Sequence, residues 1–291
     1  MIAKKHHTTI HTVFLARENL LFLKEWLFYH FNLGIDHIYL YENTGSMGRE
    51  ESTEQVNKYG INFYELTKSL TDADVIKVLN EILTEFDGRC TLIKWQPRDS
   101  DGNIVYGYED SLRHCVKTYG SDIEWIFSID IDEFLFSPSD RPLNYFTDEL
   151  SRNGHARAIY LQKKFKDRFL CLDKQVIDIE ECIEGIDTRL WAPKTMVLAD
   201  AFDPAVEFNM HCVPVTHGTT HHFDIREFRF NHYNVNEKLL GWMMAFYQTS
   251  EPFSFNAEDN SMQQYRNVVH EACKTYGSVQ WRDSILRSSM N

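Results

Sequence analysis

Short apolar runs alternate with amphipathic segments along the first half of the chain. Residues 10–16 (IHTVFLA) and 37–42 (HIYLYE) are rich in β-branched and aromatic side chains, which is typical of buried strands. Residues 19–34, between them, place leucine and phenylalanine at spacings of three and four and end in glycine. That pattern predicts a helix that stops at the glycine, with a strand on either side.

The same alternation continues to residue 132. We predict further strands over 61–66, 90–95 and 124–132, with helices over 72–86 and 107–120. Strands separated by helices need crossover connections, so the pattern indicates an α/β fold with a mostly parallel, Rossmann-like central sheet flanked by helices. Such sheets bind ligands beyond the carboxyl ends of their strands.

The second half of the chain is less regular, with prolines between its apolar segments. There we predict four strands and two helices, over 156–162, 194–199, 205–215, 226–233, 236–248 and 259–277.

No internal repeat or low-complexity linker interrupts the chain. We therefore expect a single α/β domain over residues 1–291, with a first half of about 8–140 and a second half of about 141–291. The 43% of hydrophobic and 25% of charged residues are ordinary for a soluble globular enzyme.

The formal net charge is −13, which argues against a nucleic-acid binder, because such proteins carry basic patches. The six cysteines form no C-x-x-C pair, so we expect reduced thiols in a cytoplasm-like compartment. We recognise no signal peptide and no apolar run of about 18 residues that would predict a transmembrane segment. The expectation is a soluble, cytoplasmic protein, in which any membrane association comes through partners.

Three acids lie inside the apolar stretch FSIDIDEFLFSP, residues 127–138. Asp130 and Asp132 are two positions apart, so on a strand they face the same way and can both reach a hard cation such as Mg²⁺ or Mn²⁺. Alternatively, they cap the next loop or pair with a lysine or arginine. Glu133 would point to the opposite face, where it would fix a loop or a basic side chain.

Several segments, in order, resemble glycosyltransferase family 92 and its bacterial family-2-like relatives, which have a GT-A fold. WIFSIDIDEFLF is similar to the family's W-x-x-F-x-D-x-D-E-F signature, and FLKEWLFYHFNLGIDHIYLYEN to its opening segment. RLWAPKTMVL, EFNMHCV and NHYNVNEKLLGWM are similar to its later K-x-[IV]-[VI], His and H-Y segments. The chain departs from the pattern at Glu18-Asn19, where relatives often have Asn-Glu, and at Glu42, where many have Asp.

The resemblance implies a glycosyltransferase, a hexosyltransferase with galactose as the default sugar, that uses Mn²⁺ or Mg²⁺. Its donor would be a nucleoside-diphosphate sugar, with a UDP-sugar favoured, and its acceptor a glycan hydroxyl. Residues 8–140 would then bind the nucleotide sugar and residues 141–291 the acceptor.

The resemblance also suggests which residues form the site. Those expected to border the nucleotide and its phosphates are Ala16, Arg17, Glu18, Glu42, Asn43, Asp130 and Lys194. Those expected to hold the metal ion are Asp130, Asp132, His232 and His211. The family is expected to invert the anomeric centre, which needs a carboxylate base. The alternative candidates for that base are Glu207, Asp187 and Asp224.

Two other functions compete with this interpretation. A metal-dependent phosphoesterase would need more converging acids than one D-x-D supplies. A non-catalytic carbohydrate-binding relative would have no need of the D-x-D acids. Release of free phosphate would favour the first, and sugar binding without nucleotide binding would favour the second.

Overall fold

The computed structural model of the chain describes residues 4–46, 70–86, 88–139, 141–172, 174–183, 192–247 and 254–275. The strand predicted over 61–66 lies outside these residues.

The first half follows the predicted alternation closely. Its elements are β1 (His6–Phe14), α1 (Ala16–Leu33), β2 (His37–Glu42), α4 (Asp72–Thr84), β3 (Cys90–Lys94), α5 (Tyr108–Tyr119) and β4 (Ile123–Ser128).

The second half contains more elements than its sequence pattern predicts. They are β5 (Glu133–Phe136), α6 (Leu143–Arg152), β6 (His155–Lys166), η1 (Arg168–Cys171), η2 (Val176–Asp178), β7 (Glu181–Cys182), β8 (Lys194–Leu198), β9 (Thr219–His222), β10 (Arg229–Val235), α7 (Glu237–Tyr247), β11 (Ala257–Glu258) and α8 (Gln263–Thr275).

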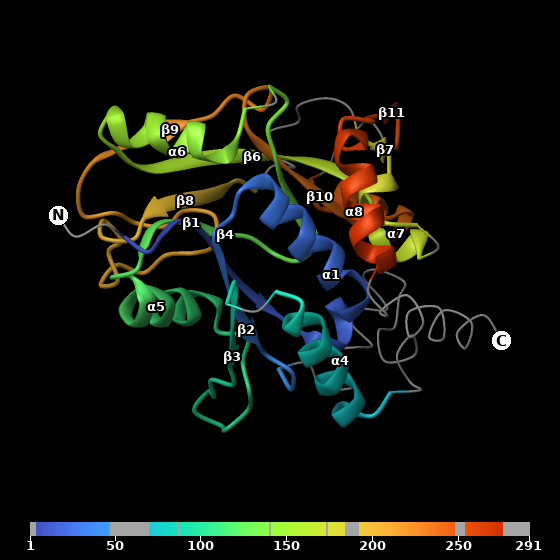
Figure 1. Ribbon diagram of the computed structural model, residues 1–291, viewed down its shortest axis with the longest axis horizontal. Coiled ribbons are helices and arrows are strands. Elements are labelled where there is room, and N and C mark those ends of the chain that lie inside the picture. Colours follow the sequence, from blue (N-terminus) through green and yellow to red (C-terminus); the bar gives the residue numbers. More distant parts are fainter. Residues whose placement is uncertain are drawn as a thin grey trace.

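The strands described form one sheet whose main path is β11-β7-β6-β8-β4-β1-β2-β3 (Figure 1). Strands β3, β2, β1 and β4 are mutually parallel, and β8 runs antiparallel between β4 and β6. Strand β6 therefore runs in the same direction as β4, and β9 and β10 pair with it in parallel. The expectation of a large, mostly parallel sheet flanked by helices is confirmed.

Helices cover both faces of the parallel strands, as their period-two burial requires. On one face, Ile10 and Phe127 pack into a large apolar core with α1, α4 and α6. On the other face, Val13 and Ile126 pack against α5, which lies on the opposite side of the sheet in Figure 1. Both faces of β1 and β4 are thus buried, which explains their continuous apolar sequences.

Helix α1 holds β5, the strand that begins at the third acid, Glu133. It ends at Gly34, whose φ of 109° suits glycine, as predicted. On its buried side, Trp26 Nε1 donates to the Glu133 carbonyl at 2.8 Å and Tyr29 donates to the Leu135 carbonyl at 2.5 Å. Strand β5 is therefore held to the helix by side-chain hydrogen bonds as well as by its pairing with β10.

Two predicted strands differ from the structure. The strand predicted to reach residue 132 ends at Ser128, because residues 129–132 turn away before β5 begins. The segment 205–215 is irregular apart from isolated bridges, so its prediction as a strand was wrong. Pro204 precedes this segment and Pro214 lies near its end, and prolines lack the N–H that pairing in a sheet needs.

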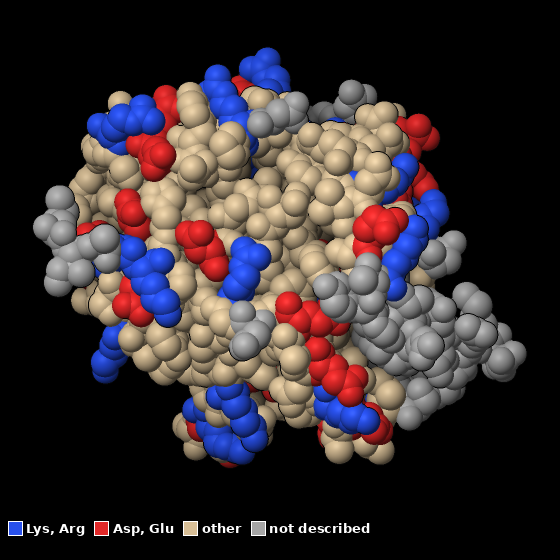
Figure 2. Space-filling model, in the orientation of Figure 1, with Lys and Arg blue, Asp and Glu red and all other residues tan. Residues whose placement is uncertain are grey.

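The outer surface carries charges of both signs. On the face shown in Figure 2, lysine and arginine are interspersed with aspartate and glutamate around a largely uncharged centre. In the described part of the chain, no helix combines the length and the apolar character that crossing a bilayer requires.

Candidate functional site

The polar residues of interest gather at one edge of the sheet. Residues 129–133, here called the acidic turn, follow the carboxyl end of β4. Because β8 is antiparallel to β4, its first residue, Lys194, lies at the same edge. Because β6 runs with β4, Arg168, just past its end, lies there too. Parallel sheets place their ligand sites at this edge.

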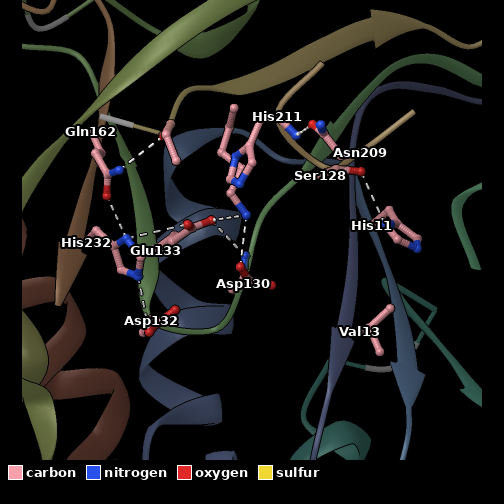
Figure 3. A network of polar contacts seen from close by, with 12 residues as sticks. His11, Val13, Ser128, Asp130, Asp132, Glu133, Gln162, Asn209, His211 and His232 are labelled. Carbon is pink, nitrogen blue, oxygen red and sulfur yellow. Dashed lines mark hydrogen bonds and ion pairs between the residues drawn. The ribbon is translucent and has the colours of Figure 1, made fainter. Parts of the chain in front are cut away.

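The acidic turn does not have the strand geometry that its sequence predicts. Asp130 and Asp132 lie in a turn, so the rule that alternate residues share a face does not apply to them. Glu133, the first residue of β5, does not point away from Asp130: its carboxylate accepts a hydrogen bond from the Asp130 amide at 2.9 Å. All three acids therefore belong to one cluster (Figure 3).

Lys194 is the cation of this cluster and is only 2% exposed. Its Nζ lies 2.8 Å from Asp130 Oδ2 and 3.0 Å from Glu133 Oε2. Burial opposes the ammonium charge, yet the two carboxylates outweigh burial and hold the pKa of Lys194 well above its usual range. Lys194 therefore stays charged. A substrate phosphate, the partner that the sequence predicts for Lys194, would contact the same ammonium group as Asp130 and Glu133.

Burial has the opposite effect on Glu133. Burial, with the neighbouring charge of Asp130, raises the pKa of Glu133 to about 8 against the attraction of Lys194. The second oxygen of Asp130, Oδ1, is buried and has no hydrogen-bond partner within the described residues. The turn thus holds more carboxylate than Lys194 alone can satisfy.

His232, on β10, faces the remaining acid of the turn. The Gln162 amide nitrogen donates to the Ala192 carbonyl at 3.1 Å, so its oxygen faces His232 and accepts from Nδ1–H at 2.8 Å (Figure 3). In the neutral imidazole, Nε2 then carries a lone pair, and it lies 3.3 Å from Asp132 Oδ2. Two acceptors that face each other need a proton or a cation between them.

The electrostatics favour ionised Asp132 and neutral His232 near pH 7. Burial lowers the pKa of His232, against the attraction of Asp132. Burial also opposes the charge of Asp132, but the protonated form of His232, with Arg168 and Lys194, holds the pKa of Asp132 well below its usual range, and the arginine and lysine charges remain when His232 is neutral. An ionised carboxylate and an imidazole whose other nitrogen is already bonded are a common ligand pair for divalent cations.

These donors fit a divalent cation that takes its other ligands from a substrate. Within the described ranges, no group of three or more His, Cys, Asp or Glu side chains could hold a metal ion. Mg²⁺, however, is usually bound by one or two carboxylates together with waters and substrate phosphates. The facing lone pairs of Asp132 and His232, with the orphaned Asp130 oxygen nearby in the turn, meet that requirement.

The predicted residues at the end of β2, Glu42 and Asn43, form hydrogen bonds to neighbouring segments of the protein. Glu42 is buried, and its Oε1 accepts from the Ala16 amide at 3.3 Å, the Thr44 amide at 2.9 Å and the Thr44 hydroxyl. The Asn43 side chain donates to the carbonyls of Trp95 and Val105 at 2.7 and 3.2 Å. Both side chains tie neighbouring segments together at the edge of the sheet.

The two charged residues that open α1 point in different directions. Arg17 binds Asp72 at 2.6 Å and the Leu70 carbonyl, on the side of α4. Glu18 approaches Arg168, with 3.6 Å between Glu18 Oε1 and Arg168 Nη2. Burial raises the pKa of Glu18 to about 7 despite that cation. The charges of Asp132 and Asp130 raise the pKa of Glu18 as well.

The remaining predicted residues are not joined to the acidic turn by any hydrogen bond or ion pair within the described residues. His211 donates from Nδ1 to the Pro193 carbonyl at 2.8 Å, next to Lys194 in the sequence. Glu207 is exposed on the irregular segment, and Asp224 is exposed and bound by Arg226 at 2.8 Å. Asp187 lies outside the described residues.

Arg168 is the functional candidate that sequence reasoning missed. Its side chain is buried at the same edge, and its charge acts on both Asp132 and Glu18. The only sequence signal was an arginine between aromatic residues in KFKDRFL, a pattern that surface loops also show.

Solved structures give only a distant match. An apo UDP-glucose pyrophosphorylase matches with a TM-score of 0.38 and 9% identity, covering 83% of this chain and 98% of that chain. A UDP-glucose pyrophosphorylase from Acinetobacter baumanii matches with a TM-score of 0.34 and 10% identity, covering 93% of this chain and 99% of that one. At such low TM-scores these matches carry no weight for the site.

Sequence comparisons are more specific. A rice protein (Oryza sativa subsp. japonica), "Glycosyltransferase family 92 protein Os08g0121900", is 23% identical over 255 residues, which are 86% of this chain. The chain spans about a third of that relative's length, since the match covers 35% of it. The family model for glycosyltransferase family 92 matches residues 7–276, which include every residue of the site described above. The chain therefore belongs to glycosyltransferase family 92.

Proposed function

We propose that the protein is a metal-dependent hexosyltransferase with a GT-A arrangement. It would move a sugar, galactose by default, from a nucleoside-diphosphate sugar, most simply a UDP-sugar, to a glycan hydroxyl with inversion. Family membership supports the reaction class. The observation that carries the metal-dependent part is the pair of facing acceptors, Asp132 Oδ2 and His232 Nε2, at the carboxyl edge of the sheet.

Asp132 and His232 would hold Mn²⁺ or Mg²⁺, with the orphaned oxygen of Asp130 as a further donor. When bound, the ion would offset the negative charge that develops on the leaving nucleoside diphosphate. The chain's own part is to fix the ligands beforehand. Gln162 orients the His232 ring by accepting from Nδ1, and the amide of Asp130 anchors the turn to Glu133.

Lys194 would reduce the electrostatic repulsion between the acidic turn and an anionic donor. Three carboxylates in four positions would repel a diphosphate. The buried ammonium neutralises part of that charge through Asp130 and Glu133 without leaving the protein interior. The remaining step, removal of the acceptor proton, needs a carboxylate base. Our candidates for it remain Glu207, Asp187 and Asp224 from the second half of the chain.

Isothermal titration calorimetry of UDP, with and without Mn²⁺, tests the proposal. We expect Mn²⁺ and UDP each to strengthen binding of the other in the wild-type protein. Asp132→Asn should remove that mutual effect and lower sugar transfer by roughly 100-fold or more, about 2.7 kcal/mol, because the ion loses a charged ligand. The matched control is Asp148→Asn on α6, whose side chain is 54% exposed.

The measurement has clear contrary outcomes. Equal UDP affinity with and without Mn²⁺ would contradict metal dependence. Release of free phosphate in place of nucleoside diphosphate would favour a phosphoesterase, and sugar binding with no nucleotide binding would favour a carbohydrate-binding protein.

A further inference from the structure

Arg168 is a buried cation whose hydrogen-bonding capacity is largely unused. It is 2% exposed, and its guanidinium lies over the rings of Phe22 and Phe169, at 4.7 and 4.9 Å from their centroids. One nitrogen, Nη2, donates to Asn19 Oδ1 at 2.9 Å. The other two nitrogens, Nε and Nη1, are buried and have no hydrogen-bond partner within the described residues.

Arg229 shows how this chain satisfies a buried arginine that has a structural role. It also lies over an aromatic ring, that of Phe136, at 4.7 Å from the centroid. Its Nε donates to Asn231 at 2.9 Å, and its Nη2 donates to Asp259 at 2.9 Å and to Ser261 at 3.2 Å. Among the residues that the structure describes, Arg168 has no carboxylate within hydrogen-bond distance, since Glu18 stays at 3.6 Å. Buried polar groups left unpaired are costly, so such an arrangement suggests a missing anion.

The place of Arg168 in the sheet indicates which anion. Across the edge, the β2 turn (Glu42–Thr44) comes first, then the acidic turn after β4, then the end of β6 with Arg168. A donor with its nucleoside near β2 and its phosphates at the acidic turn would extend its distal phosphate toward β6. Strand β10 joins the two places, because the Tyr233 amide donates to the Asp132 carbonyl at 2.9 Å and the Val235 carbonyl accepts from the Asp167 amide, next to Arg168, at 2.7 Å.

We propose that Arg168 binds the terminal phosphate of the donor's nucleoside diphosphate through the second N–H of Nη2 together with one of its two unpartnered nitrogens, Nε or Nη1. This inference rests on the proposed function and deepens it, because it adds to the metal ligands a fixed protein cation that recognises the leaving group. Nη2 with Nε, or Nη2 with Nη1, presents two parallel N–H groups that form the fork for two oxygens of a phosphate. Phe22, Phe169 and Asn19 hold the fork in place before the ligand arrives.

The test compares a diphosphate with a monophosphate in the same variant. Calorimetry in the presence of Mn²⁺ would measure the affinities of UDP and UMP, with GDP and GMP in parallel, for wild type, Arg168→Lys and Arg229→Lys. Lysine keeps the charge but cannot supply the fork. We expect Arg168→Lys to reduce the ratio of diphosphate to monophosphate affinity by about tenfold or more, the effect of roughly one bidentate contact. Arg229→Lys should leave the ratio unchanged.

The ratio separates recognition from general damage, because a destabilised fold weakens both ligands alike. A ratio in Arg168→Lys equal to that of the wild type overturns the inference, whether both affinities fall together or neither does. If Asp132→Asn loses the diphosphate preference while Arg168→Lys keeps it, only this inference fails and the proposed function stands. If the wild type binds none of the four nucleotides, the proposed function fails and takes this inference with it.

Discussion

The acidic turn and the β2 turn both follow parallel strands at the same edge of the sheet, and both bury a carboxylate. In the β2 turn, the donors that meet Glu42 come from the protein itself: two backbone amides and the Thr44 hydroxyl. In the acidic turn, the carboxylates meet a lysine, a histidine lone pair and, for one oxygen of Asp130, no partner among the described residues. The buried carboxylate of the β2 turn is therefore satisfied by the protein, and that of the acidic turn is not; the unpartnered oxygen of the β2 turn, Asn43 Oδ1, belongs to a neutral amide.

The comparison shows why a buried acid at the right edge is weak evidence for a site. Glu42 and Asn43 are where a ligand-binding residue would be expected, yet their hydrogen bonds to the Thr44 amide and the Trp95 carbonyl hold loops together. Unfilled hydrogen-bonding capacity is the better guide, because evolution rarely leaves buried polar groups unpaired without a function. Among the described residues of this edge, the unpartnered charged groups are Asp130 Oδ1 and the Nε and Nη1 of Arg168, whereas the β2 turn has the neutral Asn43 Oδ1.

The largest effect that we expect in this comparison concerns Lys194. Lys194→Met removes the only ammonium within 3.0 Å of Asp130 and Glu133 among the described residues. Breaking a buried pair in this way typically costs about 3–5 kcal/mol, because the partner charges stay buried. Urea denaturation at pH 7 would measure the loss. Lys24→Met is the matched control: Lys24 is also buried, and its Nζ lies 2.9 Å from Glu85 Oε2, away from the acidic turn.

The loss in Lys194→Met should depend on pH. It should be larger at pH 9 than at pH 7, because Glu133, whose pKa burial raises to about 8, would ionise there with no ammonium beside it. A Lys194→Met protein that is as stable as the wild type at pH 7 would mean that the acidic turn is satisfied without its lysine, and the contrast between the two turns would disappear.

The fold of the first half could be predicted because its strands and helices are determined by residues that are close together in the sequence. Strands buried on both faces read as continuous apolar runs, and a glycine in the left-handed region ends α1 where the sequence predicts. The second half depends on pairing between distant strands. The two-residue strands β7 and β11 have too few residues to show a period. Segment 205–215 has a strand-like composition, but within the described residues it forms isolated bridges and not a strand.

The site also has residues that the sequence could indicate and residues that it could not. The resemblance pointed to Asp130, Asp132, Lys194 and His232, and the structure brings these four together. It could not show that Glu133 would share Lys194, because that depends on the turn at 129–132. Nor could it identify Arg168, because what distinguishes this arginine is the hydrogen bonds that it lacks.

The β2 turn provides the contrasting prediction. Glu42→Gln keeps one acceptor oxygen but removes the charge that strengthens its hydrogen bonds to the Ala16 and Thr44 amides. We expect a loss of about 1–2 kcal/mol in the free energy of unfolding and less than a threefold change in UDP affinity with Mn²⁺. Urea denaturation and calorimetry would measure the two. A loss of UDP affinity as large as that of Asp132→Asn would place Glu42 in the nucleotide site and erase the difference between the turns.

The smallest expected effect concerns Glu18, which lies between the two turns at the start of α1. Burial raises the pKa of its carboxyl from 4.5 to about 7, so the folded protein binds the proton more tightly than the unfolded chain does. Between about pH 4.5 and pH 7 the unfolded chain therefore releases this proton first, and the stability that Glu18 contributes falls as the pH rises.

The substitution Glu18→Gln should remove this dependence. The full shift corresponds to about 3 kcal/mol, and the 24% exposure of the side chain reduces it, so we expect roughly 1 kcal/mol. Thermal melts at pH 5 and pH 8 should show the variant gaining stability relative to the wild type at the higher pH. A constant difference between the two proteins across this range would mean that Arg168 already stabilises the Glu18 carboxylate. Arg168 would then have less positive charge to offer a phosphate.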